Sequence, residues 1–299
     1  MVSSQPEGGS RQAAAEEAAP ASRTGADPTT LDIARLRPDP VFPAGGEALY
    51  RQVARITELD AEQTLLEVPC GAGRGTELLA SVTGAECFGI DPSADLIAEA
   101  EQRTRTREVA ELLHFDSGPL DDLPFRDGIF DVVLGGVGVA MHPDPGSAIR
   151  ELARVTRPMG TVVLVQPIWT GNVDESRREA LVKHLGARPL LLVEWKHLLR
   201  EAGVVDLHVE DWSDYASPFR PSLGRSLHDV SDLYSLRQKA VILHRAYRRW
   251  GWRGVRGAVV REREMHRLLS QRVLGLSLIR GTRWAGGVEA GEPEVIRGG

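Results

Sequence analysis

The apolar positions of the chain form short runs that alternate with longer amphipathic stretches. Each short run is apolar over four to six residues and is bounded by polar or turn-forming residues, as in buried strands. These runs are residues 64–68, 85–90, 112–115, 129–134 and 161–166. Apolar residues at helical spacing predict helices between them at about 75–82, 93–105 and 144–156. Strands and helices that alternate in this order favour a parallel sheet covered on both faces, which is a doubly wound α/β fold.

Further elements flank this alternating region. An amphipathic helix is predicted over residues 47–59, immediately before the first strand. Another helix follows Pro189 and ends at Gly203, where glycine suits a C-cap. Residues 204–212 then form a sixth strand, and residues 273–279 can supply a seventh.

The first thirty residues have a different composition from the rest. They are rich in Ala, Glu, Ser, Pro and Gly and nearly free of large apolar side chains, so we expect residues 1–30 to be disordered. They lack the basic-then-apolar pattern of an export signal, and no run of about 18 apolar residues follows. We therefore expect a cytoplasmic protein without an integral membrane segment. Cys70 and Cys87 each lie beside a strand-like run, which favours two reduced thiols over a disulfide or a metal site.

The charge of the chain is unevenly distributed. Residues 237–283 hold 13 Lys or Arg against only Glu262 and Glu264, a balance of +11, which leaves −17 on the rest of a chain whose formal net charge is −6. This asymmetry indicates a separate module. Residues 222–272 are predicted to form two amphipathic helices around a break at Gly251 to Gly257.

Two interpretations of this basic segment remain open. In the first, it is a lid or a dimer-forming helix pair with a solvated basic face. In the second, its arginines, together with Trp250 and Trp252, form a surface for an anionic substrate, a membrane or nucleic acid. We favour the first interpretation, with an amphiphilic or anionic small molecule beneath the lid.

Residues suited to ligand binding follow the ends of the first three strands. The turn EVPCGAGRG contains Gly71 and Gly73, which let the backbone approach a ligand, and Glu67 ends the strand before it. A glycine pair is also common in ordinary tight turns. Asp91 ends the second strand, where a carboxylate can bind both hydroxyls of a ribose or cap the next helix. Asp116 ends the third strand at the same edge, within reach of an adenine amino group.

Four segments together resemble the successive motifs of class I S-adenosylmethionine-dependent methyltransferases, especially the small-molecule, ubiquinone-biosynthesis-like group. These segments are EVPCGAG, FGIDPSADLIAEA, FDSGPLDDLPFRDGIFDVVL and AIRELARVTRPMGTVVLVQP. The resemblance spans roughly residues 47–212. It implies a Rossmann-like doubly wound sheet of about seven strands, mostly parallel with the last strand antiparallel, and a helical insertion between strands six and seven. The expected organisation is a core over 31–221, an insertion over 222–272, a last strand over 273–285 and a flexible tail over 286–299.

The resemblance also implies S-adenosylmethionine as cofactor, without a metal. The residues that would contact it are Glu67, Gly71 and Gly73 at the methionine part, Asp91 and Pro92 near the ribose, Asp116 and Ser117 at the adenine, and Leu134 and Gly135 on the far wall. Tyr50 would either cover the sulfonium or act as an aromatic residue of the core.

The chain departs from the family pattern in three places. Pro69 stands where the motif usually has its first glycine, so the loop must follow a different path. Met159 replaces a common glycine in the turn before the fifth strand, which concerns turn geometry only. Ala140 and Met141 stand where many relatives carry two histidines. His142 is then the candidate general base for a hydroxyl or acidic C–H acceptor, and an ordinary loop residue is the alternative.

The predicted function is methyl transfer to a small-molecule acceptor by direct displacement in a lid-covered site. One alternative is a noncatalytic S-adenosylmethionine-binding or scaffold protein, suggested by Pro69 and the absent histidine pair. An NAD-dependent oxidoreductase is disfavoured, because its G-x-G-x-x-G fingerprint requires glycine or alanine where Thr76 stands. Amino methylation of nucleic-acid bases is disfavoured because GGVGVAMHPDP lacks the expected Pro-Pro-aromatic motif, whereas RNA carbon or ribose methylation stays open. A homodimer through the insertion is a further expectation. The acceptor and its reacting atom do not follow from the sequence.

Overall fold

The structure is a computed structural model of the chain. It describes residues 28, 33, 36, 45–170, 173–213, 236–271 and 273–284. Most of the predicted tail 1–30, the first part of the predicted insertion and all of the predicted tail 286–299 lie outside the described residues.

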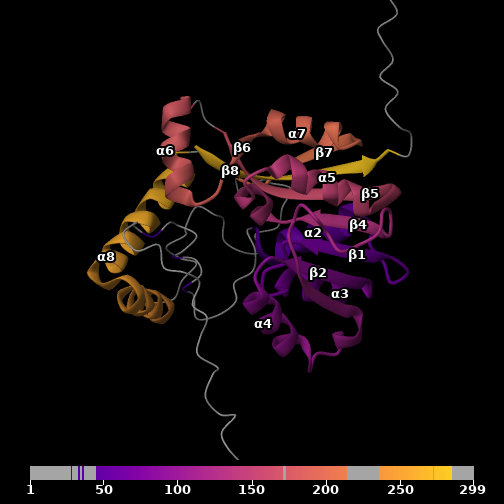
Figure 1. The fold of residues 1–299 in the computed structure, drawn as a ribbon, viewed down its shortest axis with the longest axis horizontal. Helices are drawn as coiled ribbons and strands as arrows, with labels where there is room; N and C mark the ends of the chain where they lie inside the picture. Colours follow the sequence, from indigo (N-terminus) through magenta and orange to yellow (C-terminus); the bar gives the residue numbers. More distant parts are fainter. Residues whose placement is uncertain are drawn as a thin grey trace, which may run out of the picture.

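One mostly parallel sheet forms the centre of the protein (Figure 1). Its eight strands are β1 (Thr64–Val68), β2 (Glu86–Asp91), β3 (Leu113–Ser117), β4 (Phe130–Gly135), β5 (Thr156–Trp169), β6 (Leu190–Leu191), β7 (Val204–Asp211) and β8 (Leu274–Arg283). Their order is β3-β2-β1-β4-β5-β8-β7, with the short β6 beside β5. The last strand, β8, runs antiparallel to β5 and β7, whereas the other neighbouring pairs are parallel. The predicted fold class is confirmed.

Helices connect the strands and cover both faces of the sheet. They are α2 (Gly46–Ile56), α3 (Arg74–Thr83), α4 (Ala94–Thr104), α5 (Pro145–Val155), α6 (Glu175–Leu185), α7 (Leu192–Glu201) and α8 (Leu236–Ser270), with short 3-10 turns η1 (Ala110–Leu112) and η2 (Val137–Met141). The sequence pattern did not predict α6 or β6. The helix α6 carries few apolar residues, and Leu181 and Leu185 pack into a small cluster with Trp169.

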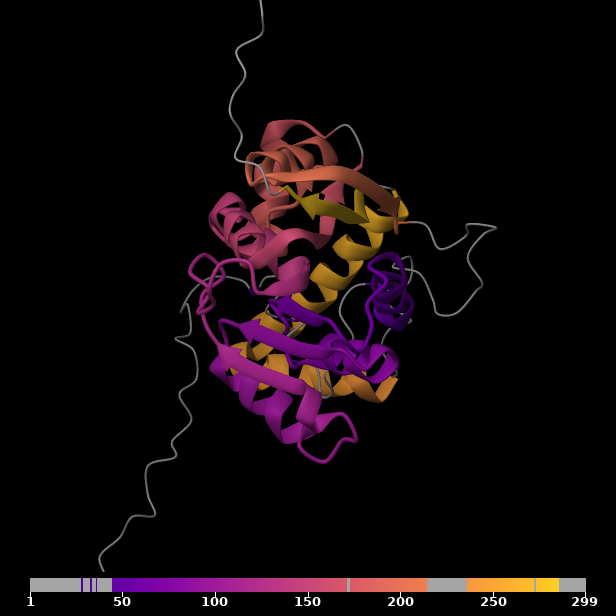
Figure 2. The same ribbon diagram turned by 90° about the vertical axis from the view of Figure 1, so that its right-hand side faces the viewer.

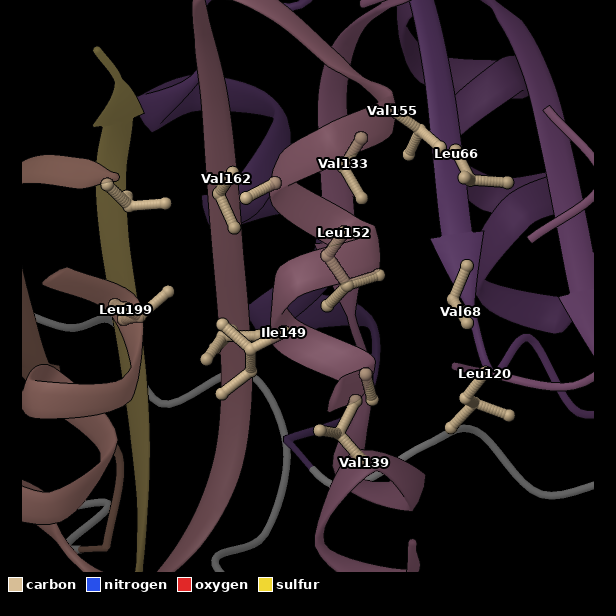
Figure 3. Packing of buried hydrophobic residues seen from close by; sticks show 14 of the residues in the cluster. Leu66, Val68, Leu120, Val133, Val139, Ile149, Leu152, Val155, Val162 and Leu199 are labelled. Atoms are coloured by element: carbon tan, nitrogen blue, oxygen red, sulfur yellow. The ribbon is translucent and has the colours of Figure 1, made fainter. Parts of the chain in front are cut away.

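The two faces of the sheet have separate cores. On one face, Ile149 and Leu152 of α5 pack against β4 and β5, together with Leu199 of α7 (Figure 3). On the other face, Leu49 of α2 and Leu79 of α3 pack against β1, β4 and β5. This two-sided burial explains why the central strands β1 and β4 read as continuous apolar runs, since neither of their faces meets water.

The helix α8 lies on the side of the molecule where the parallel strands end. In Figure 1 the arrow of β8 points away from α8, and β8 runs opposite to β5, so β5 ends on the side of α8. Figure 2, turned by 90° so that the right-hand side of Figure 1 faces the viewer, places α8 behind the sheet and agrees with this arrangement. The helix is interrupted at Gly251, whose φ of 63° and ψ of −151° are not helical. The predicted break between two helices is therefore present at Gly251.

The described residues near the N-terminus pack against α8. Leu36 forms a small apolar cluster with Ile242 and Ala246. Pro28 is buried, and its carbonyl accepts a hydrogen bond of 2.9 Å from Nε of Arg261. Pro28 thus makes a defined contact with α8, although it falls within the segment 1–30 that the sequence assigned to a disordered tail.

Candidate functional site

The turn between β1 and α3 is built on two glycines in the left-handed region. Gly71 has a φ of 57°, and Gly73, the N-cap of α3, has a φ of 69°. Side chains rarely tolerate this conformation, which accounts for glycine at both positions. A Cβ atom on Gly71 would meet nothing within 4 Å, whereas one on Gly73 would lie 2.6 Å from the ring of Phe115. The backbone at Gly71 is therefore open to a ligand, and Gly73 permits close packing behind the turn.

Asp91 connects this turn to the end of β2. One carboxylate oxygen, Oδ2, accepts a hydrogen bond from the backbone N–H of Gly71 at 2.9 Å. The other, Oδ1, accepts one from the N–H of Ser93 at 2.9 Å. Ser93 is the N-cap of α4, so Asp91 does not occupy that position. Asp91 therefore links the glycine turn after β1 to the start of α4.

Asp116 and Ser117 end β3 beside Asp91. Asp91 is paired in register with Ser117, and Ile90 with Asp116. Asp116, Ser117 and Pro92 are exposed, and Oδ1 of Asp116 accepts a hydrogen bond from the N–H of Ser117 at 2.7 Å. The predicted ribose and adenine residues therefore occupy neighbouring positions on one edge of the sheet.

Leu134 and Gly135 end β4 on the other side of β1. Both are buried, and Gly135 is paired with Val68. Gln166 of β5 holds the backbone there, because its Nε2 donates to the carbonyls of Gly135 at 3.1 Å and of Gly136 at 2.7 Å. Its Oε1 is buried without a hydrogen-bond partner among the described residues. The motif pattern did not single out Gln166, although a glutamine inside an apolar strand is an unusual residue to bury.

Glu67 lies beneath the turn in a buried hydrogen-bond network. Its Oε1 accepts from the Tyr50 hydroxyl at 2.5 Å, and its Oε2 accepts from the Thr76 hydroxyl at 2.6 Å. Burial raises the pKa of Glu67 to about 7, against the lowering effect of these two bonds. Burial, followed by the charge of Glu67, also raises the pKa of Tyr50 well above its usual range. Both oxygens of Glu67 are thus bonded to neighbouring protein side chains, and Tyr50 belongs to the core rather than to an open surface.

A glycine in α3 makes room for this network. A Cβ atom on Gly75 would lie 2.1 Å from the ring of Tyr50 and 2.8 Å from a carboxylate oxygen of Glu67. Non-bonded contacts of a Cβ atom are essentially never this short, so a larger residue at position 75 would displace Tyr50. The network ties α2, β1 and α3 together directly under the glycine turn.

Pro69 packs against the loop that follows β4. Its peptide bond with Val68 is cis. The N–H of Gly136 donates to the carbonyl of Val68 at 2.8 Å, which joins the two loops. A Cβ atom on Gly138 would lie 2.2 Å from Cγ of Pro69. The proline that departs from the family pattern therefore fits beside a residue that has no side chain.

His142 follows η2 and contacts protein atoms on both sides of its ring. Its Nδ1 is 2.7 Å from the carbonyl oxygen of Asp144, and its Nε2 is 3.5 Å from a carboxylate oxygen of Asp121. The neutral ring carries its proton either on Nδ1, which then donates to the Asp144 carbonyl, or on Nε2, which faces the Asp121 carboxylate. Of the two residues that replace the family's histidine pair, Ala140 is buried and Met141 is exposed.

The described residues offer no cluster of three or more His, Cys, Asp or Glu that could hold a metal ion. Cys70 and Cys87 are buried free thiols, and burial raises the pKa of Cys87 to about 12. Within the described part of the chain, every helix is too short or too polar to cross a membrane.

Comparisons with known proteins find a methyltransferase domain in this chain. Residues 66–164 match the family described as methyltransferase domain. Methyltransferase GfsG of Streptomyces halstedii is 28% identical over 189 residues, which cover 62% of this chain and 68% of that protein. The chloroplastic tocopherol O-methyltransferase of Arabidopsis thaliana is 28% identical over 198 residues, which cover 61% of this chain and 56% of that protein.

A solved structure shows the same fold. The phosphoethanolamine N-methyltransferase 2 of Haemonchus contortus, in complex with S-adenosyl-L-methionine, superposes with a TM-score of 0.62 at 15% identity, covering 86% of this chain and 57% of that one. The matched family, the relatives and the order of motifs along the sheet edge lead to the same assignment. Residues 66–164 are therefore a methyltransferase domain, and the relatives support a class I S-adenosylmethionine-dependent enzyme of the small-molecule group.

Proposed function

We propose that this methyltransferase acts on a small amphiphilic or anionic acceptor at the carboxyl edge of the sheet, on the side where α8 lies. The observation that carries the proposal is the hydrogen bond between Asp91 and the N–H of Gly71, flanked in register by Asp116 and Ser117. It brings three neighbouring strand ends into one continuous ligand-binding edge. This is the place where doubly wound folds bind their ligands.

The residues at this edge fit S-adenosylmethionine. Gly71 leaves its backbone open, and α3 directs its N-terminus toward the turn, which favours the carboxylate of the methionine part. Asp91 would hold the ribose and Asp116 the adenine, while Leu134 and Gly135 would close the far side. Glu67 would act from below, by holding the turn, because its two oxygens bond to Tyr50 and Thr76.

S-adenosylmethionine supplies an electrophilic methyl group, so the protein must mainly align the acceptor and exclude water. The position of α8 on the same side as the strand ends supports a role as lid (Figures 1 and 2). Its basic composition suits an anionic acceptor. A relative named for tocopherol, and a structural neighbour named for phosphoethanolamine, support an acceptor that combines apolar and polar parts or carries negative charge.

We do not assign His142 as the general base. Its ring contacts the Asp144 carbonyl and the Asp121 carboxylate, which supports a role in holding the loop after β4. An acceptor that ionises on its own needs no base from the protein. A flat pH profile across the titration range of histidine would support this, whereas a drop of about a hundredfold in His142→Gln with unchanged affinity for S-adenosylmethionine would identify His142 as a base.

Calorimetric titration of S-adenosylmethionine, S-adenosylhomocysteine and NAD into the purified chain tests the assignment of the edge. Asp91→Asn keeps the size of the side chain but removes its charge, so we expect affinity for the first two ligands to fall by about tenfold or more. Asp95→Asn, an exposed residue of α4, is the matched control and should bind as the unaltered chain does. Binding of NAD alone, or equal affinity in both variants, would overturn the proposed edge. If the chain binds S-adenosylmethionine, an acceptor screen that measures S-adenosylhomocysteine formation separates an enzyme from a noncatalytic binding protein.

A further inference from the structure

The second half of α8 presents a row of exposed residues in which aromatic or apolar side chains alternate with arginines. The residues of this row, which we call the outer stripe, are Trp252, Arg256, Val260, Arg263 and Arg267. They are spaced four, four, three and four residues apart, so they follow one face of the helix. Trp252 is 75% exposed and Val260 is 46% exposed, which is unusual for side chains of this size. Tyr247, also exposed, contacts the ring of Trp252 edge-on, at 5.5 Å between centroids.

The opposite face of the same half of α8 is packed against the protein. Ala258 and Leu268 are buried, and Leu268 belongs to the cluster formed with α6 and the ends of β5 and β8. Arg261 donates to the carbonyl of Pro28 on this inner side. The outer stripe is therefore not needed to attach α8, and its exposed apolar surface requires another explanation.

Two of the three arginines of the outer stripe have no carboxylate partner among the described residues. Arg256 and Arg263 form no ion pair with any described residue, and neither does the adjacent Arg248. By contrast, arginines elsewhere, such as Arg103 and Arg154, are paired with Glu77 and Glu151. The stripe thus carries positive charge together with an indole ring and a valine.

We propose that the outer stripe docks onto an anionic lipid surface. Indole rings prefer the level of the lipid headgroups, where one part of the ring is apolar and the N–H is solvated. Arginines beside them attract anionic headgroups while their alkyl stems stay along apolar surface. A nucleic-acid duplex would use the arginines but leave Val260 without a role. The acidic remainder of the chain does not prevent docking, because charges beyond about 8–10 Å are largely screened at physiological salt.

This docking would explain how an amphiphilic acceptor reaches the enzyme. The helix α8 lies on the side where the strands end, so a lipid surface against its outer stripe would lie near the proposed site (Figures 1 and 2). An acceptor dissolved in that surface would approach the site without crossing bulk water. This last step rests on the proposed function, whereas the docking itself does not.

Flotation of the full chain with vesicles tests the docking. We expect binding to vesicles of equimolar phosphatidylcholine and phosphatidylglycerol, weaker binding at high salt, and little binding to phosphatidylcholine alone. The variant Trp252→Ser with Arg256→Glu should bind the anionic vesicles about tenfold more weakly or worse. The matched control changes one exposed apolar and one exposed basic residue on α7, Val193→Ser with Arg200→Glu, and should bind as the unaltered chain does.

Three results would overturn the proposal. The first is no binding to anionic vesicles, or equal binding by the stripe variant and the unaltered chain. The second is retarded migration with a DNA or RNA duplex that the stripe variant abolishes, in the absence of vesicle binding. The third is a dimer in lipid-free solution, seen by light scattering, that the stripe variant dissociates. Calorimetry with S-adenosylmethionine separates the two proposals, because the stripe variant should keep full affinity, and failure of the unaltered chain to bind it would count against the proposed function alone.

Discussion

A Cβ atom on Gly138 would lie 2.2 Å from Cγ of Pro69. Pro69 replaces a glycine of the family motif in the turn after β1, and Gly138 lies in the short helical turn η2 that follows β4. The ring of Pro69 fills space that a side chain at position 138 would require. The two loops, joined also by the hydrogen bond between Gly136 and Val68, therefore form one packed unit beside the proposed ligand edge.

We expect Gly138→Ala to destabilise the protein by about 1–3 kcal/mol, because the new methyl group would collide with the proline ring. Urea unfolding measures this change. Pro69→Gly should remove most of the penalty, so the double variant should show a coupling of at least about 0.5 kcal/mol. Gly118→Ala is the control, because its Cβ would meet atoms only at 3.7 Å, an ordinary contact. Strictly additive effects of the two changes would show that Pro69 and Gly138 do not compete for space.

Met159, the second departure from the family pattern, occupies a strained conformation. Its φ is 63°, in the left-handed region, and its side chain is exposed. This conformation costs an ordinary residue roughly 1–2 kcal/mol, whereas glycine adopts it freely but loses about 0.5–1 kcal/mol of chain entropy. Met159→Gly should therefore raise the free energy of unfolding by up to about 1 kcal/mol, as measured by urea unfolding. Met159→Ala removes the same side chain but keeps the strain, so an equal gain in both variants would refute this explanation.

The repeating part of the fold was predictable from the sequence, because both faces of the central parallel strands are buried and these strands are therefore largely apolar. The elements that were missed depend on contacts distant in sequence. The helix α6 has a weak apolar pattern and is held by Leu181 and Leu185 against Trp169. The strand β6 is two residues long and exists only through its pairing with β5.

At the site, the residues at strand ends could be predicted because parallel strands bring their carboxyl ends to one edge. The partners of those residues could not. The bonds from Tyr50 and Thr76 to Glu67 join three elements that no local pattern connects. The role of Gln166 likewise depends on the neighbouring loop after β4, whose carbonyls it binds.

The raised pKa of Glu67 predicts a specific dependence of stability on pH. The folded protein binds this proton up to about pH 7, whereas the unfolded chain releases it near 4.5. Between these pH values the folded state holds more protons than the unfolded chain. The Glu67 carboxyl therefore makes the free energy of unfolding fall as pH rises. Above about pH 7 the destabilisation that it causes is constant. Glu67→Gln should abolish this pH-dependent contribution to the free energy of unfolding. Relative to the unaltered chain, the variant should gain on the order of 3 kcal/mol between about pH 4.5 and about pH 8.

Chemical unfolding of both chains across this range measures the difference. Comparing the two chains at each pH cancels the titration of all other groups. Glu99→Gln, at an exposed position on α4, is the control and should run parallel to the unaltered chain. A Glu67→Gln curve that also runs parallel would show that Glu67 is ionised in the folded protein throughout, and that its bonds to Tyr50 and Thr76 outweigh its burial.

Gln166 provides a test of whether the loop after β4 forms part of the ligand site. Its amide nitrogen donates to the carbonyls of Gly135 and Gly136, and both residues are buried. Gln166→Leu would remove this donor from both carbonyls, of which that of Gly136 keeps the N–H of Val139 at 3.0 Å, at a cost of about 1–3 kcal/mol if the loop did not move. A shift of the loop would reduce that cost but would displace the wall proposed for the cofactor. We therefore expect a loss of about 2 kcal/mol in unfolding free energy together with weaker binding of S-adenosylmethionine by about threefold or more.

Gln102→Leu, on the exposed face of α4, controls for the loss of a glutamine and should change neither quantity. Because stability and affinity are measured separately, the outcomes are distinguishable: a loss of stability with full affinity would mean that Gln166 supports the fold and does not set the position of the wall proposed for the cofactor.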